Sequence, residues 1–114
     1  MKSLIILNDP PYGTERSYNG LRLAKALINE GAEVTVFLIA DAVNCAKAGQ
    51  KIPQGFYNLE LMLKSVIRKG RVLLCGTCMD ARGLADDEIV QGGSRSTMKE
   101  LVEITMVADK VLVF

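Results

Sequence analysis

Short apolar runs alternate with longer amphipathic segments along this sequence. The runs span residues 3–7, 33–39, 71–75 and 110–114, and a very short one spans 89–90. Within each run the apolar residues fill consecutive positions rather than every second position. This pattern is typical of strands in a parallel sheet that is buried on both faces.

Apolar residues recur every three or four positions between these runs, which predicts helices. The expected helices span residues 14–30, 57–69 and 94–107, with shorter ones at 41–48 and 82–85. In the last long helix Ser94 is the expected N-cap, and the side chains expected to face inward are Met98, Leu101, Val102 and Thr105. Strands and helices therefore alternate along the whole sequence.

This alternation predicts the α/β fold class, with helices covering both faces of a parallel sheet. Residues 1–114 have the length of one domain and contain no internal repeat, linker or low-complexity stretch. Apolar residues make up 49% of the sequence and charged residues 24%, which supplies enough apolar material for one core. We therefore expect a single α/β domain.

Charge and hydropathy exclude two kinds of partner. The net charge is +1, the basic residues are scattered, and tryptophan is absent. Nucleic-acid binding needs a clustered basic face, so we expect no nucleic-acid partner. No apolar stretch is long enough to span a membrane, and the first run is too short for a signal peptide. We expect a cytoplasmic protein, in which cysteines stay reduced.

The absence of histidine limits the chemistry further. It removes Ser-His-Asp and Cys-His catalysis and every metal site that contains histidine. A closed structural zinc site needs four protein ligands, and the three cysteines fall short of that number. We expect no metal and no cofactor.

The strongest chemical signal follows the third apolar run. Ligands of open parallel sheets bind beyond the carboxyl ends of the strands, and a C-x-x-C pair, Cys75 and Cys78, lies at such an end. Backbone amides at Gly76 and Thr77, together with the guanidinium of Arg82, are expected to stabilise a thiolate and lower its pKa. This spacing favours reactive thiols and is also compatible with a thioredoxin-type redox pair.

Two other loops follow strands at the same expected edge. They contribute candidates for the wall of a thiol pocket, namely Asn8, Tyr12, Gly13 and Asp41. The first of them, residues 8–14, carries no nucleotide-binding glycine motif, and a proline turn with a structural role is its favoured interpretation. Cys45 is expected to be a buried structural residue.

Several motifs resemble the DsrE/DsrF-like family, with the greatest likeness to its YchN-like branch. They are NDPPYG (8–13), LRLA (21–24), FL with DAV (37–38 and 41–43), GQK (49–51), CGTCMDARG (75–83) and ADKVLVF (108–114). The motifs follow the family order and cover nearly the whole sequence. The cysteine loop and the last motif are fairly specific together.

This resemblance implies a three-layer α/β/α sandwich around a five-stranded parallel sheet. It also implies compact oligomers, commonly trimers or hexamers, and sulfur relay: the relatives DsrE and TusD pass sulfur as a persulfide on one cysteine. Counted back from the Arg-Gly of the loop, that cysteine falls on Cys75. Cys78 matches the second cysteine of the YchN-like branch, which the TusD-type loop lacks.

The leading hypothesis is a small cytoplasmic sulfur carrier that exchanges persulfide sulfur with donor and acceptor proteins. One alternative is a thiol–disulfide switch that uses Cys75 and Cys78, and another is a non-enzymatic oligomeric protein that binds a small ligand. Apolar side chains in excess of what one helix face needs predict a homo-oligomer, most simply a hexamer. These side chains are Phe56, Met62, Met98 and Met106.

Overall fold

The computed structural model describes residues 1–114 and contains a five-stranded sheet in which every neighbouring pair is parallel. The strands are β1 (Lys2–Leu7), β2 (Glu33–Leu38), β3 (Arg71–Cys75), β4 (Gly93–Ser96) and β5 (Lys110–Val113), in the order β4-β3-β2-β1-β5. The helices are α1 (Arg16–Asn29), α2 (Leu59–Ile67), α3 (Gly76–Ala81) and α4 (Met98–Val107), with short 3-10 helices η1 (Ala40–Ala46) and η2 (Asp86–Glu88). No helix combines the length and the apolar character needed to cross a membrane.

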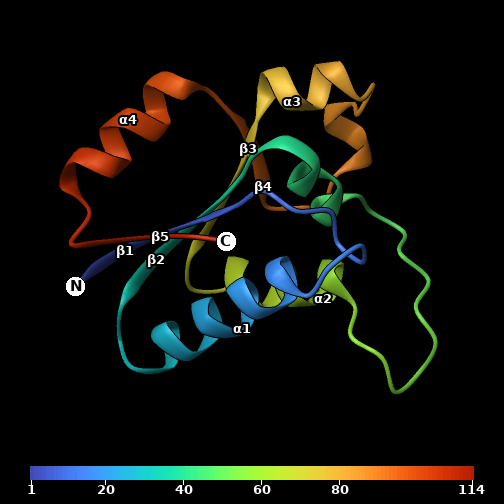
Figure 1. Ribbon diagram of the computed structural model, residues 1–114, viewed down its shortest axis with the longest axis horizontal. Helices are drawn as coiled ribbons and strands as arrows, with labels where there is room; N and C mark the ends of the chain where they lie inside the picture. The colour runs from blue at the N-terminus through green and yellow to red at the C-terminus, as the bar shows by residue number, and fades with distance from the viewer.

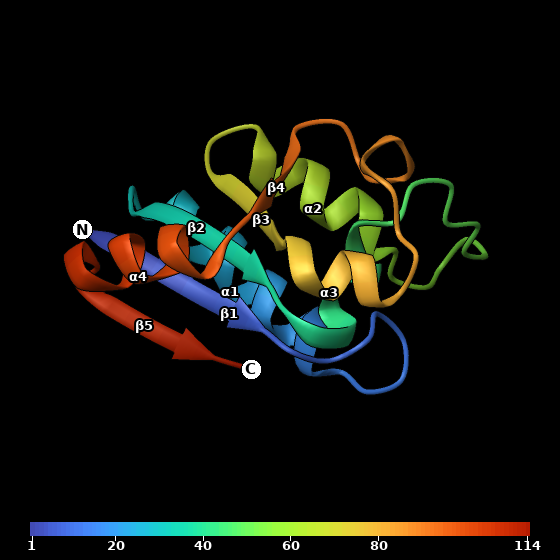
Figure 2. The same cartoon turned by 90° about the horizontal axis from the view of Figure 1, so that it is seen from above.

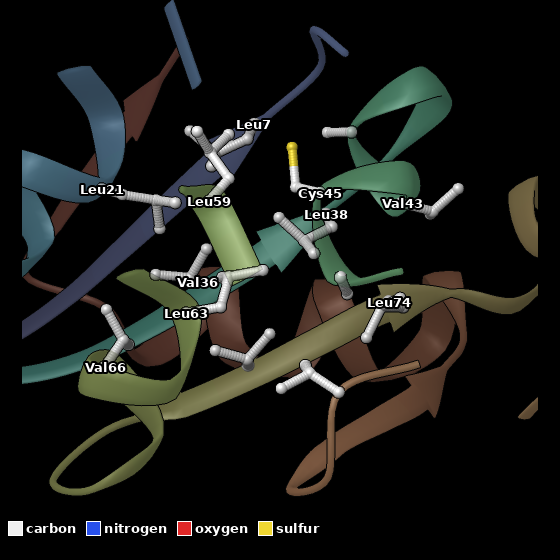
Figure 3. Close-up of a cluster of buried hydrophobic side chains, with 14 of the residues drawn as sticks. Leu7, Leu21, Val36, Leu38, Val43, Cys45, Leu59, Leu63, Val66 and Leu74 are labelled. Atoms are coloured by element: carbon white, nitrogen blue, oxygen red, sulfur yellow. The ribbon is translucent and has the colours of Figure 1, made fainter. Parts of the chain in front are cut away.

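The sheet forms the middle of three layers (Figure 1). Helices α1 and α2 cover one face and α4 covers part of the other, which confirms the expected α/β/α sandwich. Alternate side chains of one strand point to opposite faces, so Ile5 of β1 joins the larger core and Leu4 joins the smaller one. Figure 3 shows the larger core, between the sheet and α1 and α2.

The third layer is thin because a single helix supplies it. Leu101 is buried there with Leu4, Phe37 and Leu73, and Ile104 packs beside them. The prediction that Met98, Val102 and Thr105 face inward is wrong, since all three side chains are exposed. Figure 1 shows α4 inclined over only part of the sheet, so one narrow stripe of the helix reaches the core.

The fourth strand is not the apolar pair at 89–90. Ile89 forms only an isolated antiparallel bridge to Lys47, and the strand is β4, which includes Ser94. The N-cap of α4 is consequently Thr97, whose side chain accepts the Glu100 N–H at 3.1 Å. An edge strand pairs on one side only and tolerates polar residues, so β4 lacks the apolar run by which strands were predicted.

The segment after β3 also differs from the prediction. Helix α3 starts immediately at Gly76, and the helix expected at 82–85 is absent: Arg82 ends α3 and Gly83 has a positive φ of 63°. The other short helix, expected at 41–48, is the 3-10 helix η1. Figure 2 shows α3 and η1 together at the end of the sheet toward which the strands point.

Candidate functional site

Two free thiols lie together at the carboxyl end of β3. Cys75 is the last residue of the strand and Cys78 belongs to the first turn of α3, and both are half-buried. Their sulfur atoms are 2.7 Å apart. The two cysteines are not joined by a disulfide, and their sulfurs are close enough to exchange a proton or to form a bond.

The first cysteine also starts the helix that carries the second. The Cys75 sulfur accepts the backbone N–H of Cys78 at 3.3 Å, a contact usually made by the oxygen of a Ser, Thr, Asp or Asn N-cap. Because the cap is a sulfur, the turn that builds the helix also brings the two thiols together. The C-x-x-C spacing therefore caps the helix and also places the two thiols in contact.

Arg95 of β4 holds α3 from the side. Its Nη1 donates to the Gly76 carbonyl at 3.0 Å and to Asp80 at 3.0 Å, and its Nε donates to Asp86 at 2.8 Å. A Cβ on Gly76 would lie 3.0 Å from this Nη1 and 3.1 Å from the Ser96 carbonyl oxygen. Any side chain at the start of α3 would therefore press against β4. The sequence gives no signal for Arg95 as a site residue, because the apolar pattern predicts that residue 94 starts a helix, whereas residues 93–96 form a strand beside β3.

Arg82 holds the other end of α3. Its Nε and Nη2 lie 2.8 and 2.7 Å from Oδ1 of Asp41, and its Nη1 donates to the Cys78 carbonyl at 3.2 Å. The guanidinium therefore contacts carboxylate and carbonyl oxygens, and its hydrogen bonds do not reach either sulfur. Of the candidate pocket residues, Asp41 is the one that the structure brings to the cysteine loop.

The other pocket candidates have contacts elsewhere. The side chain of Asn8 donates to the Phe114 carbonyl at 3.1 Å, and the Tyr12 hydroxyl accepts the Leu59 N–H at 3.1 Å. Gly13 is exposed and lies against the ring of Pro10. These contacts connect the β1–α1 loop to Phe114, directly after β5, and to α2, in agreement with the structural interpretation of that loop.

The expectation that the Cys75 pKa is lowered is wrong. Burial raises the pKa of Cys75, and the hydrogen bond with the Cys78 thiol raises it further, whereas the backbone N–H groups of Cys78 and Thr77 act in the opposite direction. The sequence indicates which amides are near, but it does not show that apolar side chains surround the sulfur. Desolvation of the thiolate outweighs the amides here.

Cys45 has the structural environment that the sequence predicted. It is fully buried in the larger core (Figure 3), where burial raises its pKa to about 12. Its sulfur lies 3.7 Å from the Asp9 carbonyl oxygen. The two partly accessible thiols of this chain are therefore Cys75 and Cys78.

The fold and this pair of thiols define a small parallel α/β protein with a C-x-x-C at a strand end. The model of the DsrE/DsrF-like family matches residues 1–114, and the chain belongs to this family. The expected relationship is thereby confirmed.

Individual relatives agree with this assignment. Protein YchN of Escherichia coli is 40% identical over 116 residues, covering 99% of this chain and 98% of YchN. An uncharacterised protein of Methanocaldococcus jannaschii is 37% identical over 115 residues, covering 100% of both chains. Sulfurtransferase TusD of Salmonella arizonae is 26% identical over 130 residues, again covering 100% of both.

Solved structures show the same architecture. The crystal structure of YchN from E. coli has a TM-score of 0.94 at 39% identity, covering 100% of this chain and 99% of the other. A protein of unknown function from Methanobacterium thermoautotrophicum shares the fold, with a TM-score of 0.74 at 13% identity and coverage of 99% and 98%.

Proposed function

We propose that this protein is a small cytoplasmic sulfur carrier that accepts and passes on persulfide sulfur through the Cys75–Cys78 pair. The observation that carries the proposal is the 2.7 Å separation of two free, half-buried thiols at the carboxyl edge of a parallel sheet. Membership of a family that includes relatives of sulfurtransferase TusD supports sulfur as the cargo.

The transfer needs no cofactor. A thiolate of the pair attacks the outer sulfur of a donor persulfide, the donor's S–S bond breaks, and the donor leaves as a thiolate. The carrier then holds the sulfur as a persulfide. Attack on this outer sulfur by the thiolate of an acceptor protein passes the sulfur on and returns the carrier's thiolate, so neither protein is oxidised or reduced overall.

The second thiol offers another outcome. If it attacks the inner sulfur of the persulfide, the two cysteines become a disulfide and the outer sulfur leaves as hydrosulfide. A dithiol reductant must then restore the pair. The same short separation favours the alternative function, a thiol–disulfide switch, because a disulfide forms at this site with little movement of the chain.

We also propose that the working form is a homo-oligomer, a trimer or a hexamer built from trimers. Apolar side chains are exposed along the outer face of α4, at Met98, Val102 and Met106, and on the edge strand β5, at Val111 and Val113. A second copy that covers this face lies close to Cys75, which packs against the core under α4. Such a copy closes the thiol pair against water.

Mass spectrometry after incubation with glutathione persulfide tests the proposed function. We expect one added sulfur atom on the wild type and on Cys45→Ser, which keeps a donor for the Asp9 carbonyl. The double variant Cys75→Ser/Cys78→Ser is expected to take up none. Absence of both sulfur uptake and hydrosulfide release by the wild type contradicts the proposal and favours the ligand-binding alternative; formation of a disulfide with neither of them favours the redox switch.

A further inference from the structure

Ala40 has a backbone conformation that only glycine adopts readily. Its φ is 53°, and it is the one non-glycine residue of the chain with a positive φ. A Cβ is crowded in this region, and alanine lacks the polar side chain that helps asparagine or aspartate to occupy it. Strained residues of this kind cluster where the surrounding structure uses the geometry.

The strained conformation directs an amide at the thiol pair. The backbone N–H of Ala40 donates to the Cys78 sulfur at 3.2 Å, from an element 38 positions earlier in the chain. The Cys75 sulfur instead accepts hydrogen bonds from its own turn, from the N–H of Cys78 and from the Cys78 thiol. Cys78 is thus the sulfur that the neighbouring η1 supports.

The surroundings of the two sulfurs also differ. Cys75 packs against the apolar clusters of both sheet faces, including the one formed by Leu4, Phe37, Leu73 and Leu101. Cys78 packs against the larger cluster alone. A negative charge loses more solvation on a sulfur between two apolar layers, so the charge of the pair is less costly on Cys78.

We propose that Ala40 is a positioning residue that holds the negative charge of the pair on Cys78, which makes Cys78 the attacking sulfur and Cys75 the resolving thiol. This inference rests on the proposed function and assigns the attacking sulfur to Cys78, whereas the family resemblance suggested Cys75.

The chemistry then has a defined order. The Cys78 thiolate takes the outer sulfur of the donor while Cys75 keeps its proton. When Cys75 attacks the inner sulfur of the Cys78 persulfide, the Cys75–Cys78 disulfide forms and the outer sulfur leaves as hydrosulfide with that proton.

The amide of Ala40 reports the contact directly. In a pH titration followed by NMR, its ¹H and ¹⁵N shifts are expected to move with ionisation of the pair in the wild type and in Cys75→Ser. In Cys78→Ser the serine oxygen can still accept the N–H but does not ionise, so the titration of this amide is expected to disappear. Persistence of the titration in Cys78→Ser, or its absence from Cys75→Ser, overturns the inference.

Two substitutions at position 40 separate positioning from a general structural role. In the Cys75→Ser background, Ala40→Gly keeps the N–H and a favourable positive φ, and alkylation of Cys78 by iodoacetamide is expected to stay within about twofold. Ala40→Val disfavours that φ. At a pH where the thiol is mostly protonated, this variant is expected to be alkylated about tenfold more slowly, which is the effect of losing a hydrogen bond to a charged group.

The control is Ala40→Val in the Cys78→Ser background, where alkylation of Cys75 is expected to be unchanged. Equal slowing of both cysteines contradicts the inference. Peptide mapping after treatment with glutathione persulfide separates the two proposals: sulfur found on Cys75 overturns the present one and leaves the carrier function standing. No uptake by any variant, with the effect at position 40 intact, overturns the carrier function alone.

Discussion

The three cysteines of this chain differ in environment more than their spacing suggests. Cys45 is fully buried in the larger core, whereas Cys75 and Cys78 are half-buried at the carboxyl edge of the sheet. The sequence predicted that Cys75 and Cys78 lie together at the end of a strand, because the C-x-x-C spacing follows directly after an apolar run. It could not predict the contact of Ala40 with Cys78, which depends on a loop conformation and on η1 lying beside α3.

Cys45 makes the stability of the protein depend on pH. The thiol ionises at an ordinary value of 9.0 in the unfolded chain and at about 12 in the folded one. Between these values the unfolded chain has lost the proton that the folded chain keeps, so the free energy of unfolding falls as the pH rises, by at most about 1.4 kcal/mol per pH unit. At pH values below 9.0, the ordinary pKa of the thiol, the stabilising contribution of the buried neutral Cys45 is fully present.

Urea unfolding at about pH 8 and about pH 10 checks this dependence. The wild type is expected to lose more stability between the two conditions than Cys45→Ser, which has no thiol to ionise at this position. Equal losses for the two proteins would contradict the burial of a neutral Cys45 thiol.

At the scale of elements, the position of α3 depends on both of its neighbours. Arg95 connects it to β4, and the Arg82–Asp41 ion pair connects it to η1. The four apolar strands and the long helices follow from hydrophobic periodicity. Strand β4 and the direct start of α3 do not, because an edge strand can be polar and a sulfur N-cap is recognised only once the turn is formed.

Gly76→Ala tests the close approach of β4 to α3. The added methyl group would lie 3.0–3.1 Å from Arg95 and from the Ser96 carbonyl oxygen, so we expect a loss of about 1–3 kcal/mol in the free energy of unfolding. Thr77→Ala, one position further along α3 and exposed, is the matched control and is expected to change stability little. Chemical denaturation measures both, and equal effects would count against the clash.

At the scale of the whole molecule, one face of the sandwich carries most of the exposed apolar surface. Met106 is 81% exposed, and Met98 and Val102 lie on the same outer face of α4, at 58% and 52%. Residues four positions apart form one stripe on a helix, and a stripe of this kind is buried when copies of a chain associate. The proposed oligomer uses this face.

Light scattering coupled to size exclusion measures the assembly. We expect a mass of three or six times the 12.4 kDa of one chain for the wild type, and a single-chain mass for Met106→Glu, because a carboxylate is costly to bury in an apolar interface. Glu103→Gln, which removes a charge from the same helix, is expected to leave the mass unchanged or increase association. A single-chain mass for the wild type would contradict the proposed assembly.

The strand order has a consequence for biosynthesis. Strand β5 pairs with β1, and Ser3 is the register partner of Lys110. Almost all of the chain separates these two residues, so they can pair only after the last strand has been synthesised. While the ribosome is adding the intervening residues, β1 can pair with β2 on one side, but its other edge stays open until β5 is made. That edge is the place where two nascent chains can exchange their last strands. Strand β3, which ends at Cys75, lies beyond β2 and so is not part of this exchange.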